Sequence, residues 1–202
     1  MKNRTFFLLC LLLFSCSENQ QKKTIADSVA VKRPEAKHEG MGTKLSYSIL
    51  RERKDAAFSN DSLQKEITNW LAAHENVSMD SVAAFLLEMT TDNLRFSFGK
   101  CPSDANGVLK SGAANCIGYA ALFNGLMHFA IREKGWSKEF ECRHYVGKIW
   151  YGDEEVNAYF KDPFFKDHDF NVIKNRRTGK ELAVDPSLYE YLGIRWVKLK
   201  KS

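Results

Sequence analysis

Three residues of this chain have the types and order of a nucleophile, a base and an orienting acid: Cys116, His168 and Asp185. Cys116 follows small and polar residues at 111–115 and opens a long apolar segment. At a helix N-terminus, unpaired backbone amides and the helix dipole favour a thiolate and can hold an oxyanion. A cysteine nucleophile also needs a base, and His168 begins a strand-like alternation that can present one.

Asp185 is the candidate third member of this catalytic triad. A polar turn at residues 175–179 separates the segment that starts at His168 from the one that ends at Asp185. If the two segments pair about Arg176 and Arg177, His168 lies directly opposite Asp185, with Cβ atoms about 5 Å apart. The carboxylate would then orient the imidazole and stabilise its cation.

His144 is the alternative base, because it also lies on a predicted strand. No aspartate follows it at hairpin distance as Asp185 follows His168, so His168 is preferred. Without such partners, Cys116 on an apolar helix would be an ordinary small buried residue.

The remaining cysteines leave a disulfide open and argue against a metal. Cys101 and Cys142 can pair in an oxidising compartment and leave Cys116 free, but the sequence does not set their separation. The chain has no Cys-x-x-Cys and no His-x-x-x-His pair, so we predict neither a metal site nor a cofactor.

The elements that must position these residues fall into helices first and strands afterwards. Asn60 and Asp61 can cap a helix with an apolar stripe, in which Gln64 completes a capping box with Asp61, and Ser78 starts a second helix. Residues 94–98 alternate as a short extended segment, and a loop runs from 101 to 107. Residues 116–134 are apolar nearly all round, which is typical of a buried central helix that Gly135 ends.

Residues 140–151, 156–160, 168–173, 181–185 and 194–199 are predicted strands. Helices followed by strands indicate an α+β fold, in which the central helix packs on an antiparallel sheet.

The N-terminus resembles the leader of a bacterial lipoprotein. Lys2 and Arg4 precede an apolar run at 6–14 that is too short to span a bilayer, and Ser15 precedes Cys16. We therefore expect a signal peptide at 1–15, lipidation of Cys16, a flexible tether within 16–44 and a folded domain at 45–202. A lipid anchor would place the domain on a membrane surface of the cell envelope.

Charge excludes one class of partner. The net charge of +5 falls to about +3 without residues 1–15, and no dense basic stretch alternates with aromatics, so we do not expect nucleic-acid binding. The expected partners are a peptide or cell-envelope amide substrate and the membrane, through the lipid.

Three segments resemble the transglutaminase-like superfamily, whose core is papain-like: GAANCIGYA at 112–120, HDFNV at 168–172 and VDPS at 184–187. The resemblance implies a cysteine protease, an amidase or an acyl transferase that acts on amide or isopeptide bonds through an acyl-enzyme. The alternative is a catalytically inactive transglutaminase-like module that binds peptides or acts in assembly. Phe170 stands where the family often has tryptophan, Ser187 where it has threonine, and Asn115 is unusual before the cysteine. The chain lacks the clustered acids of calcium-dependent members.

Overall fold

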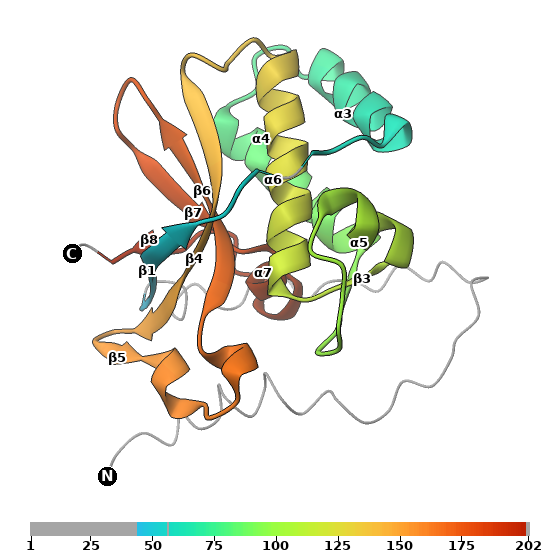
Figure 1. Ribbon diagram of the computed structural model, residues 1–202. Helices are drawn as coiled ribbons and strands as arrows, with labels where there is room; N and C mark the ends of the chain where they lie inside the picture. Colours follow the sequence, from blue (N-terminus) through green and yellow to red (C-terminus); the bar gives the residue numbers. More distant parts are fainter. Residues whose placement is uncertain (1–43, 56, 201–202) are drawn as a thin grey trace. The chain divides into compact units, whose positions relative to one another are not determined.

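A computed structural model describes residues 44–55 and 57–200 of the 202-residue chain, all within one compact unit, Ala36–Ser202. They form the mixture of helices and sheet expected of an α+β fold (Figure 1). The predicted signal peptide, the lipidation site Cys16 and the tether up to residue 43 lie outside the described residues.

A buried helix, α6 (Cys116–Glu133), lies between the other helices and the sheet (Figure 1). Its apolar surface on both sides explains this position. The helices α3 (Asp61–Ala73), α4 (Met79–Asn93) and α5 (Ala105–Ser111) pack on one side of α6. Asn60 and Ser78 cap α3 and α4 by accepting hydrogen bonds from the amides of Leu63 and Ser81. The predicted capping box of Asp61 with Gln64 is wrong, because Asp61 is already the first helical residue and Gln64 donates to the carbonyl of Phe58.

The main sheet has the strand order β7-β6-β4-β1-β8. Its members are β1 (Leu45–Glu52), β4 (Phe140–Tyr151), β6 (His168–Asn175), β7 (Glu181–Val184) and β8 (Lys198–Leu199), with β5 (Glu154–Glu155) paired to β4. The strand β8 runs parallel to β1, and Val197 bridges to Ala183 of β7. The sheet therefore nearly closes on itself.

The two faces of the sheet have different neighbours. Asn171 of β6 donates a 3.0 Å hydrogen bond to the carbonyl of Ala120 in α6, so its side chain lies on the face covered by that helix. Phe170 points to the opposite face, where its ring centroid is 4.6 Å from that of Tyr47 on β1. Because side chains alternate along a strand, His168 shares the face of Phe170, and Asp169 shares that of Asn171.

The structure corrects three of the predicted elements. The strand predicted at 156–160 is wrong: these residues include a 3₁₀ helix, η1 (Val156–Tyr159), followed by a second, η2 (Pro163–Phe165). The side chain of Asn157 stabilises η1 in this position. It accepts a hydrogen bond from the amide of Ile149 at 2.7 Å and donates one to the carbonyl of Phe165 at 2.9 Å. The strand predicted at 194–199 shortens to β8. The helix α5 begins inside the predicted loop, where Asp104 caps it.

The extended segment after α4 is a short strand, β2 (Arg95–Phe96). It pairs in parallel with β3 (Ala113–Ala114), directly before α6, and the pairing sets Phe96 beside Ala114. The sequence between α4 and α5 is thereby held next to the start of the central helix.

Candidate active site

Cys116 is the first residue of α6, as the sequence predicts, and Asn115 is the N-cap. The Oδ1 atom of Asn115 accepts hydrogen bonds from the amides of Ile117 at 3.1 Å and Gly118 at 3.4 Å. Gly118 lets neighbouring elements approach this turn closely, because a Cβ there would lie 2.6 Å from Cγ1 of Val108. Close packing leaves Cys116 only 9% exposed.

His168 begins β6, and its Nε2 atom lies 2.7 Å from Oδ2 of Asp185. Because a carboxylate oxygen can only accept a hydrogen bond, Nε2 carries the hydrogen and donates the hydrogen bond to Asp185. The thiol of Cys116 lies close enough to the imidazole to help raise the pKa of His168. The other ring nitrogen, Nδ1, is therefore the atom available to exchange a proton with the sulfur. The structure thus brings Cys116, His168 and Asp185 together.

The predicted register of the His168 and Asp185 strands is wrong by two residues. Asn171 pairs with Val184, so the position opposite Asp185 is that of Phe170 and His168 lies diagonally across. A shift of two residues keeps a side chain on the same face, whereas a shift of one would reverse it. The diagonal neighbours are still close enough for the hydrogen bond.

Asp185 is completely buried, and four donors satisfy its carboxylate. Oδ2 accepts from His168 and, at 2.6 Å, from the hydroxyl of Tyr47. Oδ1 accepts from the hydroxyl of Ser187 at 2.7 Å and from the amide of Leu188 at 3.0 Å. The last contact makes Asp185 the N-cap of α7 (Pro186–Leu192), a helix that the sequence analysis missed.

Tyr47 is a site residue that the sequence analysis also missed. It lies on β1, 138 residues before Asp185, and its side chain is 1% exposed. The alternation of Leu45, Tyr47 and Ile49 with serines was the local signal for this strand. No local pattern shows that β1 pairs with β4 and thereby brings the hydroxyl to the carboxylate.

The charges of His168 and Asp185 stabilise each other. Burial alone would lower the pKa of His168, but the charge of Asp185 and its hydrogen bond outweigh that cost and hold the pKa well above its usual value. Burial likewise opposes ionisation of Asp185, yet the imidazolium and the other donors keep its pKa below the usual value. Burial and the neighbouring carboxylate raise the pKa of Tyr47 well above normal, so its hydroxyl stays protonated as a donor.

The alternative base, His144, has an acidic partner of its own. Its Nε2 atom lies 2.8 Å from Oδ1 of Asp169, and both side chains are 2% exposed. Arg53 donates two hydrogen bonds to the same carboxylate. These charges hold the pKa of Asp169 below its usual value despite its burial. This pair was not predicted because an aspartate was expected at hairpin distance after His144, whereas Asp169 lies 25 residues later, on the neighbouring strand β6.

Cys101, Cys116 and Cys142 are free thiols in the structure, so Cys101 and Cys142 do not form the disulfide that the sequence left open. Cys142 is buried against α6, where the Nδ2 atom of Asn124 lies 3.8 Å from its sulfur. Burial raises the pKa of this thiol far above its usual value, which makes it unreactive.

Among residues 44–55 and 57–200, no group of three or more His, Cys, Asp or Glu side chains could hold a metal ion. Nor does this described part contain a helix long and apolar enough to cross a membrane.

No family model matches the chain, and no curated protein matches it. Among solved structures, the chain is similar to the periplasmic domain of TgpA from Pseudomonas aeruginosa, whose crystal structure contains bound ethylmercury. The identity is 21% and the TM-score is 0.41, and the match covers 65% of this chain and 44% of that one. The chain therefore spans less than half the length of that structure. A likeness at this level assigns no activity to the chain.

Proposed function

We propose that this chain is a transglutaminase-like cysteine enzyme with a papain-like core, in which Cys116, His168 and Asp185 act on an amide or isopeptide bond. One observation carries the proposal: the imidazole of His168 is hydrogen-bonded to the buried carboxylate of Asp185, and the thiol of Cys116 at the start of α6 lies close enough to raise the pKa of that imidazole. A nucleophile, a base and an orienting acid in this contact are the arrangement that acyl transfer requires.

In the proposed reaction, the thiolate of Cys116 attacks the carbonyl carbon of the substrate. His168, protonated at Nδ1, gives that proton to the leaving amine as the carbon–nitrogen bond breaks, which leaves a thioester on Cys116. Water, or a second amine, then attacks the thioester and transfers a proton to His168, and the thiol group is released as thiolate. Hydrolysis of a peptide or cell-envelope amide is the first candidate outcome, and transfer to an amine is the second.

The oxyanion that forms on the carbonyl oxygen needs donors at the start of α6. The amides of Ile117 and Gly118 already donate to the side chain of Asn115. The backbone amide of Cys116 itself is then the first-turn donor best placed to serve the oxyanion. Asn115 therefore both fixes the start of the helix and limits the number of amides available to the substrate.

A second candidate function keeps the fold and omits the chemistry. The small exposed fraction of Cys116 and the capping of its neighbouring amides favour a module that recognises a peptide without cutting it.

The lipid anchor at Cys16 belongs to both candidates. We propose that it holds the domain on a membrane of the cell envelope, and loss of radiolabelled palmitate from a Cys16→Ser chain would test it.

Alkylation of Cys116 separates the two functions. We expect iodoacetamide to label Cys116 first in the folded protein, with Cys142 protected by burial, and a Cys101→Ser background to remove the other partly exposed thiol of the described residues. The substitution His168→Ala should slow this labelling by about 10²-fold or more, because general base assistance is lost. Peptide mapping by mass spectrometry measures the site and rate. A Cys116 thiol that stays inert in the folded protein would support the binding module instead.

A further inference from the structure

An aromatic cluster lies beside the three proposed catalytic residues. We define it as Phe96, Phe98, Phe164, Phe165 and Tyr191. The ring centroid of Phe98 is 5.0 Å from that of Phe96, 6.2 Å from Phe164 and 6.1 Å from Phe165. Phe96 in turn contacts Tyr191 of α7 at 5.3 Å. Three segments far apart in sequence thus meet in one apolar surface.

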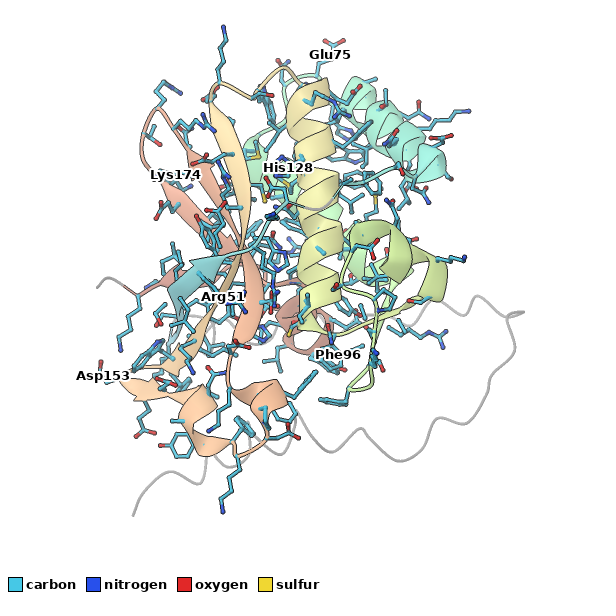
Figure 2. The ribbon with its side chains drawn as sticks, viewed as in Figure 1. Arg51, Glu75, Phe96, His128, Asp153 and Lys174 are labelled. Carbon is cyan, nitrogen blue, oxygen red and sulfur yellow. The ribbon has the colours of Figure 1, made fainter. Side chains whose placement is uncertain are left out.

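Two sides of the aromatic cluster lie on, or beside, the chain segments that lead into Cys116 and His168. Phe96 pairs with Ala114, two residues before Cys116, and its ring centroid lies 6.1 Å from that of Tyr119 in the first turn of α6. Figure 2 shows Phe96 near the end of α6 at which that helix begins. On the other side, Phe165 ends η2 three residues before His168. A substrate held by these rings would therefore lie against the segments that position Cys116 and His168.

Hydrogen bonds fix the backbone on both sides of the aromatic cluster. The amide of Ser97 donates to the carbonyl of Ala114 at 2.8 Å, next to Phe96 and Phe98. The carbonyl of Phe165 accepts from the buried side chain of Asn157 at 2.9 Å. Because both segments are held in place before anything binds, little conformational entropy is lost when a ligand orders against them.

Two members of the aromatic cluster keep a large exposed fraction: Phe98 at 44% and Tyr191 at 38%. Exposed rings next to reacting groups gain free energy when an apolar group covers them. We propose that the aromatic cluster binds an apolar side chain of the peptide whose carbonyl group Cys116 attacks. This inference rests on the proposed function and adds a substrate class to it: peptides with an aromatic or large aliphatic residue near the attacked bond.

The ring geometry favours a side chain over a sugar. Sugars stack on a broad, flat aromatic face, whereas Phe98 meets Phe96, Phe164 and Phe165 at interplanar angles of 71°, 60° and 60°. Rings inclined to one another in this way present edges and faces in several directions. Such a surface suits a compact apolar side chain, which aromatic rings contact both edge-on and face-on.

Binding to the full-length chain carrying Cys116→Ala tests the proposal without any turnover. Two neutral pentapeptides that differ only in a central phenylalanine or serine serve as probes, with calorimetry as the measurement. We expect the phenylalanine peptide to bind about tenfold more tightly, and Phe98→Ala to reduce that preference to about twofold or less. Leu50→Ala removes an even more exposed apolar side chain, on β1 outside the aromatic cluster, and it should leave the preference unchanged.

Equal affinity for the two peptides, including no measurable binding of either, would overturn the proposal, as would a preference that survives Phe98→Ala. Binding of an N-acetylglucosamine oligomer that depends on Phe98, in place of peptide binding, would reassign the aromatic cluster to sugars and equally overturn it. The proposed function fails by a different result, an inert Cys116 thiol. A reactive thiol without any peptide preference would refute the peptide subsite alone.

Discussion

The Nε2 atom of His168 and the Oδ2 atom of Asp185 are 2.7 Å apart although the two residues lie diagonally across strands β6 and β7. Asp185 can make this contact because it stands after the last residue of β7, as the N-cap of α7. The carboxylate therefore orients the imidazole and starts a helix with the same group. Pro186, at the first position of α7, has a backbone fixed in the helical range and no amide hydrogen to satisfy.

Asp185→Asn should lower the pKa of His168. Burial, the largest influence on this group, already favours the neutral ring, and the carboxylate that opposes it would be gone. We expect the midpoint of the imidazole titration to fall in NMR spectra and the alkylation of Cys116 near neutral pH to slow by about tenfold or more. Asp167→Asn, which removes a neighbouring aspartate, serves as the control. An unchanged midpoint in the Asp185 variant would contradict the assigned role.

The same pair predicts how stability depends on pH. The raised pKa of His168 contributes stability that is complete below about 6.5 and is lost as the pH rises through the folded-state pKa. The lowered pKa of Asp185 contributes stability that is complete above about 3.9 and is lost as the pH falls through its folded-state pKa. The free energy of unfolding in urea should thus differ most between wild type and His168→Ala from about pH 4 to 6.5. A difference that does not vary with pH would contradict this.

Tyr47→Phe should cost about 1.5–3 kcal/mol in the free energy of unfolding, because it removes a buried donor to a charged carboxylate. Tyr159→Phe makes the same chemical change at an exposed hydroxyl that contacts Glu154, and it should cost about 0.5 kcal/mol or less. Urea unfolding of both variants measures the difference. The alkylation rate of Cys116 should fall less with Tyr47→Phe than with Asp185→Asn, since His168 keeps its carboxylate. Equal costs for the two tyrosine variants would show that the contact at Asp185 adds nothing to stability.

The sequence was sufficient to predict the residues of the site that lie within local patterns. Cys116 at the start of an apolar helix and His168 at the start of a strand follow from capping and alternation. Long-range pairing was beyond it: Tyr47 reaches Asp185 only because β1 inserts between β4 and β8. The two-residue register error arose because the turn at 175–179 was taken as symmetric about Arg176 and Arg177. The prediction nevertheless put His168 and Asp185 on the same face of the sheet, because a shift of two residues does not change the face.

The network of His144, Asp169 and Arg53 should act in stability and not in catalysis. His144→Ala removes one donor from the buried carboxylate of Asp169 and leaves Arg53 as its partner, so we expect a loss of about 1.5–3 kcal/mol in the free energy of unfolding. His144→Gln retains a side-chain donor and provides a folded variant for kinetics. Its Cys116 alkylation rate should stay within about threefold of wild type, whereas His168→Gln should show the loss expected of a missing base. A folded His144→Gln chain with an inert Cys116 would instead make His144 the base.

Asn115 should influence stability and reactivity in opposite directions. Asn115→Asp keeps an N-cap acceptor and places a negative charge at the positive end of α6, so the free energy of unfolding should hold or rise slightly. The same charge lies next to the sulfur and disfavours both the thiolate and an oxyanion, so alkylation should slow by about tenfold.

Asn115→Ala is the matched variant. It should lose about 1 kcal/mol of stability with the cap, yet it frees the amides of Ile117 and Gly118 and should not slow alkylation. Thermal unfolding and alkylation kinetics on both variants measure the two effects. Parallel changes in stability and rate would mean that Asn115 acts on the thiol only through the integrity of the helix.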